Sequence, residues 1–280
     1  MKIATHADWL AAEPFTLVLS AGFFGFYAHV GLICALEQSG LVPRRVVGTS
    51  AGAISGGLWA SGVPGEELVE MLVGLRREDF WDPSWDELRR SRRRARRRRE
   101  LDEGRDPGTA LGLLRGRKLD ALLLDGLARA RADSSQPLVE RIEQCPIPFA
   151  AVTHELRARR TWVHERGPLR PAIRASCALP LMFGPVRIGG RLHADGGISD
   201  RPGFSALAPG ERALYHHLPH RSRWPRLSGD EAGERRDRAE RKVIVIDDLP
   251  RVHPGALARG AAALERAREH TLRWLGAPSE

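Results

Sequence analysis

The stretch RVVGTSAGAISGGLWA, residues 45–60, decides the fold of this chain. It opens with RVVG at 45–48, whose two β-branched valines are typical of a buried strand. It continues over 50–60 as a helix rich in small residues, which ends before Gly62. Strand, tight turn and helix thus follow one another directly. This alternation is typical of a βαβ unit in a parallel sheet.

The turn between this strand and this helix carries a serine with small neighbours. Ser50 lies at the centre of G-T-S-A-G, and such a sharp turn needs small residues two positions away on each side, here Gly48 and Gly52. The helix directs its N-terminus at the site, and the N–H of Ala51 is placed to donate to an oxyanion. The pattern indicates a nucleophile elbow. The alternative is a helix entry in which Ser50 is only an N-cap.

The preceding strand and loop extend the same pattern towards the N-terminus. FTLVLS at 15–20 predicts a buried strand, a loop follows at 21–25, and helical periodicity runs over 26–39. Gly22 and Gly25 can turn N–H groups inward, and a nest of such donors beside the serine would complete an oxyanion hole. The alternative is a strand-to-helix turn that binds nothing. Nucleotide binding is disfavoured because G-x-G-x-x-G is absent and no acidic residue ends the second strand.

An aspartate followed by two glycines stands late in the chain. Asp195 precedes Gly196 and Gly197, and glycine at these positions lets another backbone come close. The alternative is a type I′ turn, which Asp-Gly often forms. That alternative loses weight because the preceding hairpin already has its own turn at 189–190. Asp195 is therefore a candidate functional residue.

Taken in order, the glycine loop, G-T-S-A-G and D-G-G-x-x-x-x-P resemble the motifs of the patatin-like phospholipases, over roughly residues 15–203. The resemblance implies a three-layer α/β/α fold with a mainly parallel central sheet. It also implies a catalytic dyad, in which Ser50 attacks the ester carbonyl of a lipid or phospholipid and Asp195 accepts its proton. A carboxylate can do this only where desolvation raises its basicity or access of water is restricted.

The resemblance also implies which backbone groups face the oxyanion. They are the N–H groups of Gly22, Phe23, Gly25 and Ala51. The loop departs from the commonest family pattern, G-G-G-x-[KR]-G, because Ala21 and Phe23 replace two glycines and no basic residue follows. Backbone donors survive such side-chain changes, so we expect activity to be retained.

The domain organisation predicted from the sequence has three parts. We expect an N-terminal extension at 1–14, a catalytic domain at 15–206 with an arginine-rich insertion at about 84–108, and a strand–helix extension packed on the same domain at 207–280. A polar, proline-containing segment at 219–241 predicts a mobile loop. Further helices are predicted at 66–75, 118–132, 169–176 and 254–275, and further strands at 148–153, 161–164, 185–188, 191–193 and 242–247.

Composition places the chain among globular proteins. Its 280 residues are 42% hydrophobic and 28% charged. The three scattered cysteines form no C-x-x-C pair, which favours reduced, buried thiols in a cytoplasm over disulfides or a zinc site. No secretory signal is recognisable at the start of the chain. Neither a metal nor an organic cofactor is implied.

The formal net charge of +9 favours an anionic partner. Nine of the eleven residues from Arg89 to Arg99 are arginine, and aromatic side chains precede them. Two interpretations of this run stay open, peripheral contact with an anionic membrane and a solvated insertion without a specific partner, and the second is favoured. Nucleic acid is disfavoured because no recognised binding module surrounds the run.

Two other classes of function stay open at the level of sequence. One is an acyltransferase or thioesterase that uses the same dyad. The other is a non-catalytic protein that keeps the fold and binds membranes or other anionic surfaces. A histidine-containing triad is disfavoured because the serine comes after only about two strands and the aspartate already belongs to a D-G-G loop, so His216 and His253 are expected to be dispensable.

Overall fold

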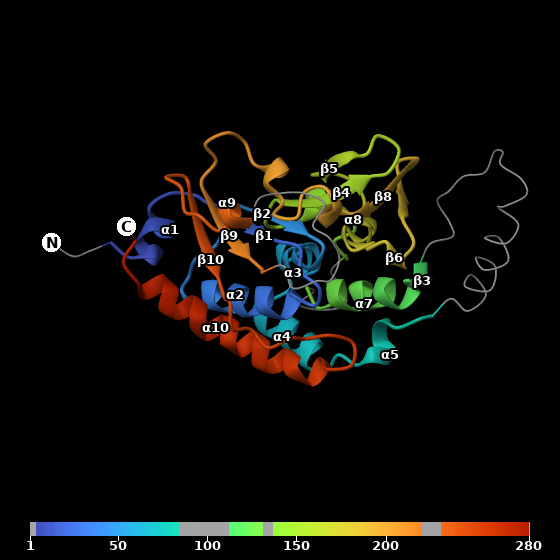
Figure 1. Cartoon of the computed structure of the whole chain (residues 1–280), viewed down its shortest axis with the longest axis horizontal. Helices are drawn as coiled ribbons and strands as arrows, with labels where there is room; N and C mark the ends of the chain where they lie inside the picture. The colour runs from blue at the N-terminus through green and yellow to red at the C-terminus, as the bar shows by residue number, and fades with distance from the viewer. Residues whose placement is uncertain (1–3, 84–111, 131–136, 220–230, 280) are drawn as a thin grey trace, which may run out of the picture.

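The computed structural model of the chain describes residues 4–83, 112–130, 137–219 and 231–279, and Figure 1 shows their arrangement. The helices are α1 His6–Ala12, α2 Phe26–Gln38, α3 Ala51–Ala60, α4 Gly65–Val73, α5 Arg77–Phe80, α7 Arg117–Ala128, α8 Leu169–Ser176, α9 Glu231–Glu234 and α10 Gly260–Gly276. The strands are β1 Thr16–Leu19, β2 Arg45–Thr49, β3 Gly112–Leu114, β4 Phe149–Glu155, β5 Arg160–His164, β6 Leu181–Phe183, β7 Val186–Ile188, β8 Arg191–Asp195, β9 Ala213–His217 and β10 Arg241–Val245.

Within the described residues, an eight-stranded sheet organises the molecule. Its strand order is β10-β9-β1-β2-β4-β8-β7, and β5 pairs with β4 outside this path. The five strands from β10 to β4 are mutually parallel, whereas β5, β7 and β8 pair antiparallel. The predicted α/β fold with a mainly parallel central sheet is therefore confirmed. β3 and β6 form a separate parallel pair.

The register of the parallel strands brings their carboxyl ends to one edge. Leu19 at the end of β1 pairs with Gly48 in β2 on one side and with His216 in β9 on the other. The loop after β1 and the turn after β2 therefore leave the sheet side by side. Open parallel sheets bind their ligands at this edge, which makes it the place to look for a site.

One face of the sheet is covered by helices that share the main hydrophobic core. Figure 1 shows α10 lying along α2 and α4, and the three helices contact one another. The approach of α10 to α2 requires glycine, because a Cβ built on Gly31 would lie 2.2 Å from the carbonyl oxygen of Leu264. Among the described residues, no helix is long and apolar enough to cross a membrane.

The opposite face of the sheet carries a smaller apolar cluster. Val47, Val152 and Tyr215 belong to it, and Phe204 and Leu207 pack against it. Phe204 lies in a 3-10 turn at Phe204–Ala206, which follows another at Gly196–Ile198. In the ranges that the structure describes, this layer consists of short turns and extended chain rather than of a long helix.

Several element boundaries differ from those predicted. The segment expected as an extension at 1–14 contains α1, which begins at a capping box between Thr5 and Asp8. The helix predicted at 118–132 spans 117–128. The helix predicted at 254–275 begins at Gly260, after a 3-10 turn at Leu257–Arg259, so its predicted start was wrong.

The arginine-rich insertion and about half of the predicted mobile loop lie outside the described ranges. The run Arg89–Arg99 and residues 220–230 belong to this part of the chain. Within the predicted loop at 219–241, the structure instead has the short helix α9. Strand β9 precedes that loop and was not predicted.

Candidate active site

Ser50 occupies the sharp turn between β2 and α3. Its φ of 53° and ψ of −115° place a non-glycine residue at positive φ, a conformation that costs about 1–3 kcal/mol and is common at functional sites. A Cβ on Gly48 would lie 2.4 Å from the carbonyl oxygen of Gly52, and a Cβ on Gly52 would lie 2.1 Å from that of Leu19. Both flanking glycines are therefore required by close backbone contacts, as the motif predicts.

Asp195 is the last residue of β8 and is buried, with 4% of its surface exposed. Its Oδ2 accepts a hydrogen bond from the Oγ of Ser50 at 2.7 Å, and its Oδ1 accepts one from the N–H of Gly197 at 2.8 Å. A Cβ on Gly196 would lie 2.3 Å from the carbonyl oxygen of Val152. The two glycines after Asp195 thus let the loop approach β4 and cap the carboxylate.

Burial raises the pKa of Asp195 from 3.8 to about 6. The hydrogen bonds from Ser50 and Gly197 and the positive charge of Arg201 act in the opposite direction, but more weakly than the loss of solvation. The carboxylate is therefore ionised at neutral pH and is more basic than an exposed aspartate. A base with a pKa near the working pH is well matched to proton transfer.

The end of α8 holds the backbone of Ser50 on both sides. The Oγ of Ser176 accepts a hydrogen bond from the N–H of Ser50 at 2.8 Å and donates to the carbonyl oxygen of Val152 at 2.6 Å. The Sγ of Cys177 donates to the carbonyl oxygen of Ser50 at 3.1 Å. Burial raises the pKa of the Cys177 thiol well above its ordinary value, so the thiol stays protonated and can donate. Neither Ser176 nor Cys177 was predicted as a site residue.

The glycine loop at 21–25 lies beside this pair. A Cβ on Gly197 would lie 3.2 Å from the Cβ of Ala21, so the loop after Asp195 touches the glycine loop. The N–H of Gly25, a predicted oxyanion donor, is engaged with the carbonyl oxygen of Gly22 at 2.9 Å. In the described ranges, the N–H groups of Gly22, Phe23 and Ala51 donate to no acceptor.

The histidines close to this edge of the sheet bond elsewhere. His154 contacts the hydroxyl of Ser199 at 3.0 Å, and His193 contacts that of Thr153 at 3.0 Å. Across the described parts of the chain, no histidine is hydrogen-bonded to the serine or to the aspartate of the pair. The same ranges contain no cluster of histidine, cysteine or acidic side chains that could hold a metal ion.

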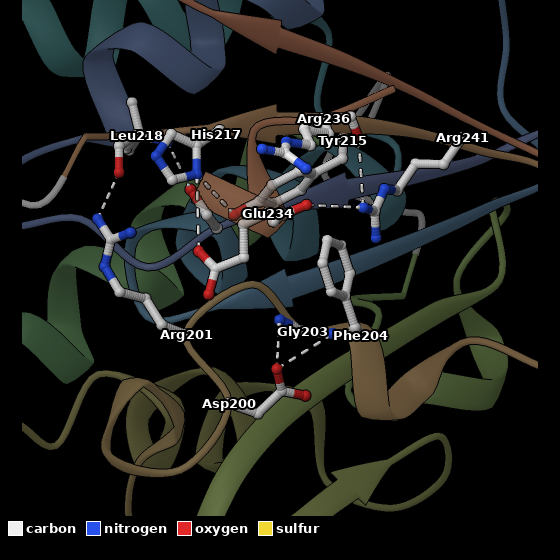
Figure 2. Close-up of polar contacts among 12 residues, drawn as sticks. Asp200, Arg201, Gly203, Phe204, Tyr215, His217, Leu218, Glu234, Arg236 and Arg241 are labelled. Atoms are coloured by element: carbon white, nitrogen blue, oxygen red, sulfur yellow. Dashed lines mark hydrogen bonds and ion pairs between the residues drawn. The ribbon is translucent and has the colours of Figure 1, made fainter. Parts of the chain in front are cut away.

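A cavity of about 600 Å³ lies away from the serine–aspartate pair. It is bounded by the segment after Asp195 and by the start of β10, and neither member of the pair lines it. Figure 2 shows its polar groups: Arg241 lies over the ring of Phe204 at 4.3 Å, and the carboxylate of Asp200 accepts the N–H groups of Gly203 and Phe204. We place the candidate site at the hydrogen-bonded pair Ser50 and Asp195 and not at this cavity, because the size of a cavity by itself implies no chemistry.

A mainly parallel sheet, with a strained serine turn hydrogen-bonded to a buried carboxylate at its carboxyl edge, is the arrangement expected of an α/β protein of the serine-hydrolase class. The particular family follows from comparison with known proteins. Residues 17–208 match the model of the patatin-like phospholipase family, and the chain belongs to this family.

Similar proteins include an uncharacterized NTE family protein of Mycobacterium bovis, which is 34% identical over 221 residues, or 79% of this chain. The neuropathy target esterase of Drosophila erecta is 27% identical over 200 residues, which cover 70% of this chain and 12% of the esterase. The chain spans 51% of the length of the mycobacterial relative.

Among solved structures, VipD from Legionella pneumophila is similar with a TM-score of 0.50 and 15% sequence identity. The similarity covers 94% of this chain and 67% of VipD. At this level of identity the comparison supports the fold alone.

Proposed function

We propose that this protein hydrolyses carboxylic esters of lipids through an acyl-serine intermediate, with Ser50 as nucleophile and Asp195 as general base. The single observation that carries the proposal is the 2.7 Å hydrogen bond between the serine Oγ and a buried carboxylate whose pKa is raised to about 6. Membership of the patatin-like phospholipase family supports it, as does similarity to a protein named as an esterase.

The proposed reaction has two halves that use the same carboxylate. In the first, the Oγ of Ser50 bonds to the ester carbonyl carbon while its proton passes to Oδ2 of Asp195. The tetrahedral intermediate collapses as the C–O bond to the alcohol breaks, and Asp195 returns the proton to the leaving oxygen. In the second half, water loses a proton to Asp195 and attacks the acyl-serine. The bond between the acyl carbon and Oγ then breaks, the fatty acid is released, and Asp195 returns the proton to the Oγ of Ser50.

Backbone N–H groups are the proposed stabilisers of the negative charge that develops on the carbonyl oxygen. Ala51, in the first turn of α3, and the loop residues Gly22 and Phe23 have N–H groups without acceptors in the described structure. The positive end of the dipole of α3 adds to their effect. Loss of one such donor typically lowers kcat by about 10²–10³-fold.

Labelling with a fluorophosphonate probe tests the proposal, beside hydrolysis of a p-nitrophenyl ester. Wild type should be labelled at Ser50 and should hydrolyse the ester, whereas Ser50→Ala and Asp195→Asn should do neither. Ser61→Ala is the matched control, since its hydroxyl donates to the carbonyl oxygen of Leu58 at the far end of α3, and it should behave as wild type. Folded wild-type protein that is neither labelled nor active would contradict the proposal and favour a non-catalytic binding protein.

The same experiment separates hydrolysis from acyl transfer. Adding an alcohol or thiol acceptor to the ester reaction distinguishes them by their products. Free fatty acid as the main product supports a hydrolase, while a dominant ester or thioester of the acceptor would show a transferase. In either case Ser50 forms the acyl intermediate, so the dyad is tested independently of the acceptor.

We also propose that the protein acts in the cytoplasm at the surface of anionic membranes. The net charge of +9 and the run Arg89–Arg99 support this, since each basic residue near an anionic bilayer contributes about 1 kcal/mol. Co-sedimentation with vesicles containing anionic lipid, compared with neutral vesicles, tests the proposal. Equal binding to both would contradict it.

A further inference from the structure

Ser20 connects β1 to the glycine loop, and each of its polar groups is held by another element. Its N–H donates to the carbonyl oxygen of His216 at 3.4 Å, and its hydroxyl accepts the N–H of Leu218 at 2.9 Å. Its carbonyl oxygen lies 2.9 Å from Nε2 of His29 on α2. The next residue, Ala21, donates its N–H to the carbonyl oxygen of Arg201 at 2.9 Å. The entry to the loop is therefore fixed from three directions.

The hydrogen bonds of His29 define its tautomer. A carbonyl oxygen can only accept, so Nε2 of His29 carries a proton and donates it to Ser20. Burial lowers the pKa of His29 to about 4, so the ring is neutral and its Nδ1 is an acceptor. The Nδ1 of His216 lies 2.9 Å from that atom and must be the donor. The two imidazoles thus form a directed chain that ends on the Ser20 carbonyl.

The hydrogen-bonded pair of His29 and His216 lowers the stability of the core relative to apolar side chains in the same place. Both histidines are fully buried, and Nε2 of His216 has no hydrogen-bond partner among the residues that the structure describes. Burying polar groups with incomplete hydrogen bonding destabilises a fold, whereas apolar side chains of similar shape do not carry this cost. The arrangement is therefore better explained by the geometry it imposes on the glycine loop than by packing.

The residues after β9 hold the other side of the loop. A Cβ on Gly22 would lie 2.5 Å from Cδ1 of Leu218, and a Cβ on Gly25 would lie 2.1 Å from it, so the loop is packed directly on this side chain. The carbonyl oxygen of Leu218 accepts a hydrogen bond from the guanidinium of Arg201, as Figure 2 shows. Leu218 therefore joins the glycine loop to the segment that follows Asp195.

We propose that His29 is a positioning residue for ester hydrolysis, and that it acts with His216 and Leu218 to hold the glycine loop in the conformation that presents its N–H groups to the oxyanion. The inference rests on the proposed function. It also extends the site beyond residues 17–208, the part of the chain that matches the family model, because His216 and Leu218 follow that match. It revises the expectation from the sequence that His216 is dispensable, because His216 bonds His29.

The test compares His29→Gln with His29→Leu. A glutamine amide can place a donor near the position of Nε2, while leucine leaves the Ser20 carbonyl without one. Misplacement of a catalytic group by about 1 Å can cost 10²-fold in rate. We therefore expect His29→Leu to lower kcat and the rate of fluorophosphonate labelling by about 10–100-fold with KM within about twofold, and His29→Gln to retain most of both rates.

Leu36→Ala is the control for lost stability, because Leu36 is fully buried in the same helix and lies in the main core. All variants are assayed well below their melting temperatures. The positioning role is overturned if His29→Leu keeps the wild-type kcat, if His29→Gln is as impaired as His29→Leu, or if Leu36→Ala loses as much kcat as His29→Leu. Any of these results with active wild type and inactive Ser50→Ala would leave the proposed function intact.

Amide hydrogen exchange tests the same inference without relying on activity. His29→Leu should accelerate exchange in a peptide that covers residues 21–25, relative to wild type, while Leu36→Ala should not. Unchanged exchange in His29→Leu would overturn the inference even if the protein hydrolysed no ester. Failure of the proposed function would instead appear as wild type indistinguishable from Ser50→Ala in labelling and hydrolysis.

Discussion

Asp195→Asn should make the protein more stable at neutral pH while it removes activity. Asparagine keeps the shape of the side chain and can still accept the N–H of Gly197 and bond the hydroxyl of Ser50 through its amide. It lacks the charge that burial disfavours. The substitution therefore removes a destabilising feature of the folded state without opening a cavity.

The size of the effect follows from linkage between proton binding and folding. Burial raises the pKa of Asp195 from 3.8 to about 6, and each tenfold change in the protonation equilibrium corresponds to about 1.4 kcal/mol. Above pH 6 the carboxylate is ionised in both states, so wild type is less stable than the asparagine variant by about 3 kcal/mol. As pH falls through 6 the folded state binds the proton first, and the difference shrinks to about half by pH 5 and vanishes below pH 3.8.

Urea unfolding of both proteins at pH 8 and pH 5, followed by circular dichroism, measures this difference. The asparagine variant should have the higher unfolding free energy at pH 8, and its advantage should be clearly smaller at pH 5. Asp125→Asn, on the exposed side of α7, should show little difference from wild type at either pH. An asparagine variant that is less stable than wild type, or whose advantage does not depend on pH, would refute the reasoning.

Two further predictions concern the pH dependence of catalysis and the tight backbone contact at the serine turn. The kcat/KM of wild type should fall about tenfold for each pH unit below about 6, because protonation of Asp195 removes the proposed base, and a profile that is flat to pH 4.5 would argue against this carboxylate as the base. Gly52→Ala should lower the unfolding free energy by about 3 kcal/mol or more, since the added Cβ would lie 2.1 Å from a carbonyl oxygen of β1. Gly184→Ala, with no atom within 4 Å of its Cβ, should change stability little in the same urea titration.

The sequence predicted those parts of the molecule in which local pattern and chemistry coincide. The elbow around Ser50 is specified within a few residues, because the strand, the turn and the flanking glycines must all be adjacent. Asp195 could be singled out for the same reason, by the two glycines that let its loop approach β4. These local constraints are steric, and sequence displays them directly.

Apart from the Ser50–Asp195 pair, which the family resemblance implied, features that depend on contacts between distant segments were not predicted. The role of Ser176 is visible only when α8 is placed against the serine turn, where the hydroxyl accepts the N–H of Ser50. β9 has the sequence ALYHH at 213–217, and its histidines suggest an exposed segment, yet every residue of the strand is buried. His216 is buried because it bonds another histidine 187 positions away in sequence, a contact that no local pattern reveals.

Two unfavourable features of the fold are concentrated at the carboxyl edge of the sheet. Ser50 adopts a positive φ, and Asp195 ionises without solvent. Each persists because neighbouring segments leave no alternative: α8 bonds both sides of the Ser50 peptide, and the glycines beside Asp195 are closed against β4. A carboxylate that replaces an imidazole as base must be made basic by desolvation. The same desolvation lowers the free energy of unfolding, so activity in this fold is gained at the expense of stability. Asp195→Asn removes the buried charge, so this variant should be both more stable than wild type at pH 8 and inactive.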